Sequence, residues 1–375
     1  MTPLWHARQR ALGWVRRNTR WEFWPPAMAY VPVVPYVLFQ SIRHRSLTLF
    51  TAANPGIPSG GFVGESKAAI LGNLARAADF DVLSADLPIH VRVRAVKSFL
   101  AERRLSFPVV LKPDVGQRGA GVAIARSEQD VVSYFQTATG ETIMQRYVDG
   151  LEFGIFYYRF PGQPEGKIFS ITIKRFPAVI GDGSSTVEEL ILRDDRAVCL
   201  ADLYTRRLKC PAGYVPAAGE GIPLAELGSH CRGAIFLNGS DLETEALRRS
   251  VDDLARSYPG FYFGRFDIRS ASIADLRAGR FEVLELNGVS AEATHIYDPA
   301  VSLLDAYRTL FRQWRLAFEI GAANRKAGFQ PMRLREFVRL VAAQQFPAVK
   351  KQHARRTKHD DNRQGEELSM IADGR

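Results

Sequence analysis

Two pairs of polar residues, about twenty positions apart, carry the chemistry that this sequence suggests first. Arg265 and Asp267 stand two apart in the stretch GRFDIR, and Glu285 and Asn287 stand two apart in EVLELN. Because side chains alternate between the faces of a strand, each pair points to one side if these stretches are strands. Neighbouring strands would then gather two carboxylates and an amide. These are the hard oxygen ligands that Mg²⁺ accepts, with Mn²⁺ as an alternative.

The alternative interpretation is a hairpin whose acidic side chains face water. Two details favour the metal site. Glu285 interrupts an apolar run formed by Val283, Leu284 and Leu286, and a carboxylate among apolar groups is costly unless a cation compensates it. The stretch that follows, GVSAEATHIYDP, is rich in small and polar residues, as is typical of a loop that faces a substrate.

A second pattern, upstream, suggests a phosphate site. The stretch FPVVLKPD predicts a buried strand that ends near Lys112, and a glycine-rich turn with Gly119 and Gly121 follows it. Backbone amides approach phosphates closely where side chains are absent, and a lysine ammonium adds positive charge. The alternative is a plain glycine-rich hairpin beside a surface lysine, because the stretch is neither a Walker A motif nor a clean GxGxxG.

The order of these patterns resembles the ATP-grasp ligases, in particular D-alanine–D-alanine ligases and the ATP-grasp region of cyanophycin synthetases. GRFDIR followed by LELNGVSAEATH is similar to the metal-binding end of that family. The strand with Lys-Pro-Asp and the glycine-rich turn is similar to its grasp hairpin, and RFPAVIGDGSSTVEELI is similar to a stretch of cyanophycin synthetases. The resemblance covers about residues 65–326. It implies an α+β fold in which two α+β subdomains close on ATP.

The resemblance also implies which residues bind ATP. Lys67, at the start of an expected helix capped by Ser66, and Lys112 are similar to the family's two ATP lysines. The backbone around Gln145 is similar to the hinge that meets adenine, where the family usually has an acidic residue. The implied cofactor-binding set is Lys67, Lys112, Gly119, Gly121, Gln145, Tyr147, Val148, Glu152 and Lys174.

Some of these roles have alternatives. Glu152 is similar to the carboxylate that holds the ribose hydroxyls, but it could be an exposed strand acid. Arg175 competes with Lys174 for the phosphates. The implied metal ligands are Asp267, Glu285 and Asn287. Arg265 is expected to stabilise the transferring phosphoryl group or the tetrahedral intermediate, with Ser290 and His295 facing the acceptor.

The activity that the resemblance implies is that of an ATP-dependent carboxylate–amine ligase. ATP and Mg²⁺ would convert an amino-acid or peptide-like carboxylate to an acyl phosphate, which an amine attacks, releasing ADP and phosphate. The loop DVGQRGAGV differs from the serine-bearing loop of D-alanine–D-alanine ligases, so D-alanine is not the expected substrate. Two alternatives remain open: a catalytically idle, membrane-associated ATP-binding scaffold, and an ATP-grasp phosphotransferase.

The N-terminal segment, residues 1–64, takes the place of the family's usual N-terminal domain. Five arginines precede an uncharged stretch, residues 23–42, that contains four prolines. Proline disfavours a single membrane-spanning helix, so we expect either a dip into one leaflet or a proline-rich arm packed on the body. A short strand is expected at 47–50. The expected division continues with subdomains at 65–150 and 151–346 and a disordered polar tail at 347–375, while 192–238 has no predicted role.

Composition limits the remaining possibilities. The 375 residues carry a net charge of +10, which suits anionic partners such as a nucleotide or an acidic lipid surface. The sequence has no zinc finger, RNP motif or basic recognition helix, so nucleic acid is not an expected partner. The three cysteines fit neither a metal site nor a disulfide framework, which indicates a reducing compartment: the cytoplasm, or the inner face of the membrane. The oligomeric state is not predicted.

Overall fold

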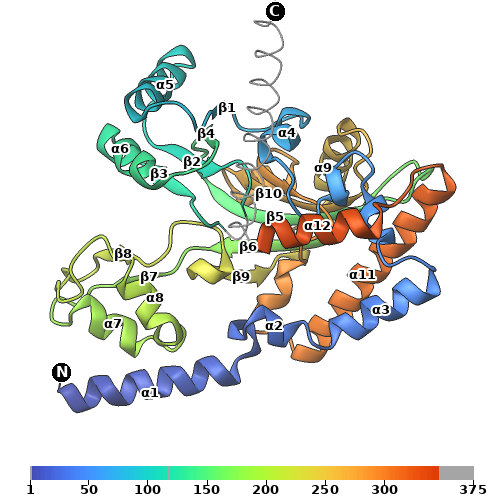
Figure 1. Cartoon of the computed structure of the whole chain (residues 1–375). Helices are drawn as coiled ribbons and strands as arrows, with labels where there is room; N and C mark the ends of the chain where they lie inside the picture. Colours follow the sequence, from blue (N-terminus) through green and yellow to red (C-terminus); the bar gives the residue numbers. More distant parts are fainter. Residues whose placement is uncertain (1, 117–118, 346–375) are drawn as a thin grey trace, which may run out of the picture.

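The computed structural model describes residues 2–116 and 119–345, so the predicted disordered tail at 347–375 lies outside the described residues. It shows two principal antiparallel sheets with helices on their faces, which confirms the predicted α+β architecture (Figure 1). The first sheet has the order β1-β4-β2-β3. Its strands and covering helices are β1 (Phe80–Leu83), α5 (Ile89–Glu102), β2 (Val109–Pro113), β3 (Ala123–Ala125), α6 (Glu128–Thr137) and β4 (Thr142–Arg146).

The second sheet has the order β11-β10-β5-β6-β9 and carries both polar pairs. Its strands are β5 (Leu151–Tyr158), β6 (Lys167–Arg175), β9 (Ile235–Asn238), β10 (Phe263–Ser270) and β11 (Glu282–Asn287). One face packs against α9 (Glu245–Ser257), where Phe153 and Ile155 of β5 meet Leu247 and Val251 in the core. The residues that alternate with them, such as Glu152, therefore point to the opposite face.

A smaller unit follows β6. It contains the two-stranded sheet of β7 (Ala178–Ile180) and β8 (Gly221–Pro223), with α7 (Val187–Arg193), α8 (Ala201–Thr205) and the 3₁₀ helices Ala197–Leu200 and His230–Arg232. The start of α7 is a capping box, in which Thr186 and Glu189 satisfy each other's backbone amides. Most of residues 192–238, which had no predicted structure, belong to this unit and its return to β9.

The N-terminal arm packs on the body. It contains α1 (Pro3–Thr19), the 3₁₀ helix Trp21–Phe23, α2 (Pro26–Ala29) and α3 (Val33–Arg43). In Figure 1 these helices run along one edge of the molecule. Helix α1 packs against the smaller unit, and α3 packs against the long helix α11 (Leu303–Lys326), which α12 (Leu334–Gln345) follows. No helix within residues 2–116 and 119–345 combines the length and the apolar character needed to cross a membrane.

The strand expected at 47–50 is wrong. Residues Leu49–Ala53 form a 3₁₀ helix that packs against α11 and buries Leu49, Phe50 and Ala53. The next segment is fixed by buried Asn54, whose side-chain nitrogen donates to the carbonyls of Gly60 and Phe263. The remaining short elements are the 3₁₀ helices Pro58–Gly60, Ser240–Leu242 and Thr294–Tyr297 (η7), together with α4 (Lys67–Gly72) and α10 (Ile273–Arg277).

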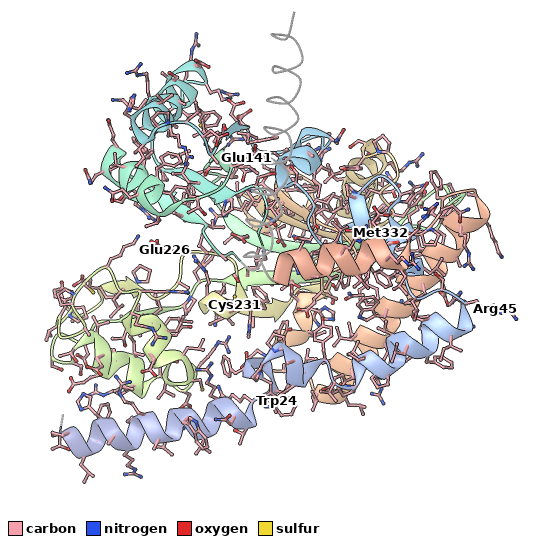
Figure 2. All side chains as sticks on the ribbon, viewed as in Figure 1. Trp24, Arg45, Glu141, Glu226, Cys231 and Met332 are labelled. Atoms are coloured by element: carbon pink, nitrogen blue, oxygen red, sulfur yellow. The ribbon has the colours of Figure 1, made fainter. Side chains whose placement is uncertain are left out.

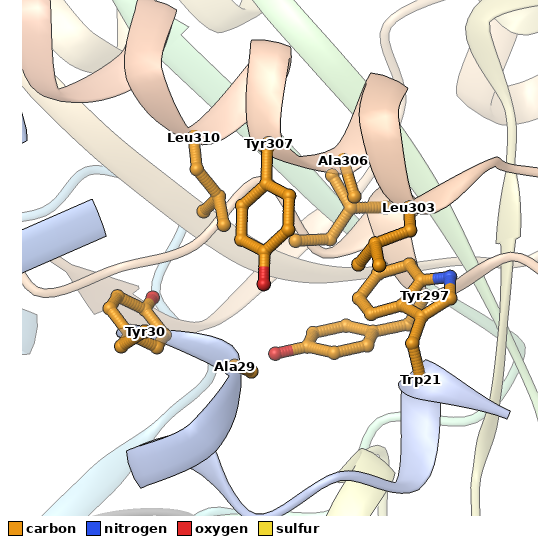
Figure 3. A pocket seen from close by; sticks show the side chains of 9 residues that line it. Trp21, Ala29, Tyr30, Tyr297, Leu303, Ala306, Tyr307 and Leu310 are labelled. Atoms are coloured by element: carbon orange, nitrogen blue, oxygen red, sulfur yellow. The ribbon is translucent and has the colours of Figure 1, made fainter. Parts of the chain in front are cut away.

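The arm and α11 meet over a small apolar cavity of about 10 Å³. Figure 3 shows Trp21 and Tyr30 from the arm facing Tyr297, Tyr307 and the start of α11 across it. A space of this size holds one water at most. It is therefore a packing gap between the arm and α11 rather than a ligand site.

Candidate nucleotide and metal site

The two polar pairs are brought together by antiparallel pairing of β10 with β11. In this register Arg265 lies opposite Asn287 and Asp267 lies opposite Glu285, as the prediction of neighbouring strands requires. On the other side of β10, Gly154 of β5 lies opposite Asp267. A Cβ at Gly154 would stand 3.2 Å from Cδ of Arg265 and 3.4 Å from Oδ1 of Asp267, so glycine leaves room for this pair.

Cations already neutralise both carboxylates. Nζ of Lys67 lies 2.6 Å from Oε1 of Glu285, and Nζ of Lys174 lies 3.0 Å from Oδ1 of Asp267. Arg265 bonds both oxygens of Asp267, at 2.9 and 3.1 Å. Burial alone would raise the pKa of Asp267, but Arg265 and Lys174 outweigh it and hold that pKa at about 2. For Glu285, Lys67 and Lys112 likewise overcome burial and lower the pKa.

Lys67 is positioned by the beginning of α4. The hydroxyl of Ser66 accepts from the amide of Ala69 at 3.0 Å, which confirms the predicted N-cap. Asp114, just beyond β2, accepts from the amide of Ala68 at 2.8 Å and from the Ser66 hydroxyl at 3.0 Å. The helix start is thus tied to the end of β2, the strand that carries Lys112.

Lys112 is a buried ammonium group at the junction of the two sheets. Its Nζ donates to Oε1 of Gln145 on β4 at 2.8 Å and to the carbonyl of Leu284 on β11 at 3.1 Å. The side chain is 6% exposed, and burial lowers its pKa to about 8. No carboxylate pairs with it among the residues that the structure describes. The alternative of a surface lysine beside a plain hairpin is therefore wrong.

Glu152 is not the exposed strand acid of the alternative interpretation, because it is buried between two cations. Nζ of Lys174 lies 3.0 Å from its Oε1, and Nη2 of Arg269 lies 3.0 Å from its Oε2. Arg269 also donates to the carbonyl of Val148 at 2.6 Å and lies over the ring of Tyr147. Arg269 thereby links Glu152 to the expected adenine hinge. Sequence reasoning missed Arg269, although it follows Asp267 by two residues and shares its face of β10.

Sequence reasoning also missed the segment 226–232, which touches both the glycine-rich turn and the Glu152 cluster. A Cβ built on Gly228 would fall 1.8 Å from Oε1 of Glu152, so the backbone of Gly228 lies directly on that carboxylate. Arg232 donates to the carbonyl of Val122 at 3.3 Å and packs beside Gly119. Figure 2 shows Glu226 close to the unit of the first sheet and Cys231 beside β9. The segment therefore covers one side of the expected nucleotide site.

The three predicted catalytic residues are not gathered at one point. Arg265 lies in the cluster and donates to the carbonyl of Glu292 at 3.0 Å. Ser290 donates its hydroxyl to the carbonyl of Gly61 at 3.0 Å. His295 lies on η7, which packs against β6 and β9, at the edge of the sheet opposite β11. Burial lowers the pKa of His295. Its ring makes no hydrogen bond or ion pair with Arg265, Asp267 or Glu285, and its Nδ1 is buried without a hydrogen-bond partner in the described part of the chain.

The side chain of Glu292 is held by the arm and by η7. Its carboxylate accepts from the hydroxyl of Tyr30, on the arm, and from the hydroxyl of Tyr297 at 3.0 Å. Because Arg265 bonds the backbone of this same residue, the arm is joined to the polar cluster through a single side chain. No sequence pattern pointed to Glu292 or Tyr30.

The oxygen donors fit a divalent cation only in company with other ligands. Asp267 and Glu285 supply two carboxylates from adjacent strands, and the Asn287 amide, which donates to Oδ2 of Asp267 at 3.4 Å, supplies a third group. Within the described residues no cluster of three or more His, Cys, Asp or Glu residues could hold a metal. This donor set suits Mg²⁺, which binds through one or two carboxylates together with phosphate oxygens and water.

Comparison with known proteins found one family match and several similar solved structures. Residues 75–152 match the model of the RimK-like ATP-grasp domain. Solved structures that resemble the chain include a bifunctional glutathione synthetase from Pasteurella multocida, with 16% identity over 66% of this chain and 35% of the synthetase and a TM-score of 0.34. The D-cycloserine synthetase DcsG has 15% identity over 66% of this chain and 68% of that one, with a TM-score of 0.35.

A D-alanine–D-alanine ligase from Bacillus anthracis, solved in complex with ATP, has 15% identity over 76% of this chain and 70% of the ligase, with a TM-score of 0.37. No curated protein sequence matched the chain. At 15–16% identity none of these likenesses extends to a substrate. The match to the RimK-like ATP-grasp domain covers residues 75–152, which lie within the part of the chain where the order of motifs resembles the ATP-grasp ligases.

Proposed function

We propose that this protein is an ATP-dependent carboxylate–amine ligase that forms an amide or peptide bond through an acyl phosphate. ATP would be held between the two sheets, with its phosphates among Lys67, Lys112 and Lys174. Asp267, Glu285 and Asn287 would hold Mg²⁺, which when bound supplies positive charge to the phosphate oxygens. The acceptors are small molecules of the amino-acid or peptide class, with one contributing the carboxylate and the other the amine.

The observation that carries the nucleotide part of this proposal is the state of Lys112. Its ammonium group is buried, bonds only neutral oxygens and has a pKa lowered to about 8. Glu285 attracts this ammonium from nearby without an ion pair to it, and a polyphosphate placed beside it would supply a direct counter-ion and offset the cost of burying the charge. Lys67 and Lys174 lie on the two carboxylates next to it. The positive charges of the cluster therefore exceed the negative charges of its carboxylates, which favours the binding of an anion.

Arg265 has the position expected of a group that acts on the transferring phosphoryl. Its guanidinium bonds Asp267 and the backbone of Glu292, so it is fixed between the strand that carries the acids and the loop that follows them. A fixed cation of this kind stabilises charge that develops during transfer without reorganising. The contribution of the protein to the reaction would then be positioning and charge neutralisation.

The test is ADP release by the purified protein with Mg²⁺, ATP and a panel of amino acids and short peptides. A ligase releases ADP and phosphate only when both a carboxylate and an amine are supplied. A phosphotransferase leaves phosphate on a stable product, and an idle scaffold binds ATP without turnover. Either of these two results would reject the ligase proposal.

Two substitutions examine the metal ligands in the same assay. Asp267→Asn and Glu285→Gln should abolish ADP release while the circular dichroism spectrum stays that of the parent. Turnover at the parental rate in both variants would contradict the assignment of these two carboxylates.

A further inference from the structure

Both long helices of the arm leave large apolar side chains exposed to the solvent. The inner side of α3 carries buried Val33, Gln40 and Ser41, at 1%, 1% and 3% exposure. Leu38, Phe39 and Ile42 of the same helix are at least half exposed, and Ile42 reaches 77%. A helix on the surface of a water-soluble domain usually turns polar side chains to the solvent, so the exposed apolar side chains of α3 are unusual.

Helix α1 also leaves apolar side chains in the solvent, on the side away from its contacts with the protein. Its inner side is marked by Gly13, where a Cβ would fall 2.5 Å from the carbonyl oxygen of Val198. Arg10 and Arg16 reach from this side to carboxylates of the smaller unit, with Arg16 at 2.6 Å from Asp195. At 100° per residue, Leu4 and Val15 lie on the side of the helix opposite Gly13, and both are at least half exposed.

The helices that carry these exposed side chains follow one another along the molecule. Figure 1 shows α1, α2 and α3 in succession along a single edge of the molecule. The turn between the long helices adds further exposed apolar groups, including Met28 and Val31. We define the arm surface as the exposed apolar side chains of α1, of α3 and of the turn between them. Monomeric soluble proteins rarely leave a contiguous patch of this kind uncovered.

The charge around the arm surface indicates what covers it. Residues 1–64 contain seven arginines and one acidic residue, Glu22. Glu22 is buried and already paired with Arg196 at 2.6 Å. Arg8, Arg17 and Arg43 are exposed, and the described residues provide no carboxylate for them. The occupant must therefore be apolar in its interior and negative at its boundary.

We propose that the arm surface binds the surface of an anionic lipid bilayer, with α1 and α3 lying in the plane of the membrane. In-plane helices of this kind insert apolar side chains at the level of the headgroups while arginines bind the anionic lipids. A second copy of the chain fits less well, because two such surfaces in contact would place arginines against arginines. The contact leaves the nucleotide cluster free and ties it to the membrane through Tyr30 and Glu292.

The experiment is sedimentation of the full chain with vesicles of equal parts phosphatidylglycerol and phosphatidylcholine, compared with vesicles of phosphatidylcholine alone. We expect binding to the anionic vesicles and its loss at high salt. Leu38→Ser combined with Ile42→Ser should weaken binding by at least about tenfold. Each substitution among Arg8→Gln, Arg17→Gln and Arg43→Gln should weaken it by about fivefold at low salt.

The matched control is Val82→Ser with Ile180→Ser, which removes two exposed apolar side chains away from the arm and should leave vesicle binding unchanged. Unaltered thermal midpoints would show that every variant folds. Failure to bind the anionic vesicles, or equal binding to both kinds, would overturn the proposal. So would a lipid-free dimer, seen by sedimentation velocity, that Leu38→Ser with Ile42→Ser dissociates, since the occupant would then be a second copy.

Discussion

At the scale of single residues, the protonation state of Lys112 is expected to control how ATP affinity depends on pH. In the folded protein its pKa is about 8, against 10.5 for an ordinary lysine. Below about pH 8 the ammonium is charged, and a bound polyphosphate stabilises that charged form. Above about pH 8 the free protein loses this proton, so binding ATP must first restore it. ATP affinity is therefore expected to fall as the pH rises through this range.

We predict that the dissociation constant for ATP rises by up to about tenfold per pH unit above about pH 8. Lys112→Arg should abolish this dependence, because a guanidinium stays charged throughout. Lys112→Met should bind weakly at every pH. Calorimetric titrations across the range provide the measurement, with Lys97→Met, an exposed lysine paired with Glu128, as the matched control. A parental pH profile in Lys112→Arg would contradict the prediction.

A second prediction concerns Asp267 in the absence of any ligand. Its folded pKa of about 2 lies below the ordinary aspartate pKa of 3.8, because Arg265 and Lys174 outweigh the effect of burial. This difference stabilises the fold at every pH above about 4 and is lost as the pH falls toward 2. Asp267→Asn should therefore lower the free energy of unfolding by about 2 kcal/mol near neutral pH, and the deficit should vanish near pH 2.

Urea unfolding at several pH values measures this effect. The control is Asp81→Asn, because the ion pair of Asp81 with Arg103 is partly exposed and should contribute much less. A deficit for Asp267→Asn that stays constant down to about pH 2 would show that the pairing is not its cause.

At the scale of elements, the strands that carry the polar pairs and the start of α4 could be predicted because their patterns are local. Alternation placed Arg265 with Asp267 on one face of β10, and Ser66 has the chemistry of an N-cap. The run at 47–50 could not be assigned, because LTLF suits a strand and a buried 3₁₀ helix equally and only contact with α11 decides between them.

The contribution of 226–232 to the site could not be predicted for a different reason. Gly228 has no side chain, and its effect is a close approach of backbone that only the tertiary fold creates. The same holds for Glu292, whose tyrosine partner Tyr30 lies 262 positions away along the chain. Roles that depend on distant contacts leave no periodic pattern in the sequence.

We predict that Gly228→Ala disturbs the nucleotide site. Its methyl group would fall 1.8 Å from Oε1 of Glu152 and 2.9 Å from Cδ of Lys174, so the segment or the ion pair must shift. Overpacking of this kind costs about 1–3 kcal/mol. The thermal midpoint should fall, and ATP should bind about tenfold more weakly or worse.

The matched control for this element is Gly213→Ala, in the same part of the chain, where an added Cβ meets nothing within 4 Å. It should leave both the thermal midpoint and ATP affinity unchanged. If the parent and Gly228→Ala bind ATP equally well, the segment 226–232 is not part of the nucleotide site and the prediction is wrong.

At the scale of the whole molecule, the two sheets are joined along β11. The first unit reaches it through Lys67 to Glu285, through Lys112 to the carbonyl of Leu284 and through Arg146 to Glu282. A nucleotide that binds at this junction would hold the two units together, whereas α1 packs against the smaller unit and α3 packs against α11. Ligands at the two places should therefore leave separate footprints.

Hydrogen exchange measures those footprints. ATP with Mg²⁺ should slow amide exchange in 109–125, in 226–232 and in β11, and should leave α1 and α3 unaffected. Anionic vesicles should slow exchange in α1 and α3 alone. Protection of the arm by ATP in the absence of lipid would show that the two regions are not separate.

The two arm helices are attached by different forces, and ionic strength acts on these forces in opposite directions. Helix α1 is fastened largely by arginine–carboxylate pairs at half-exposed positions, whereas α3 is seated by apolar packing such as the stacking of Tyr36 on Phe311. Added salt screens the former, and a salting-out anion such as sulfate strengthens the latter. In concentrated ammonium sulfate, the first twenty residues, with α1, should therefore detach from the body, whereas α3 should pack more tightly against α11.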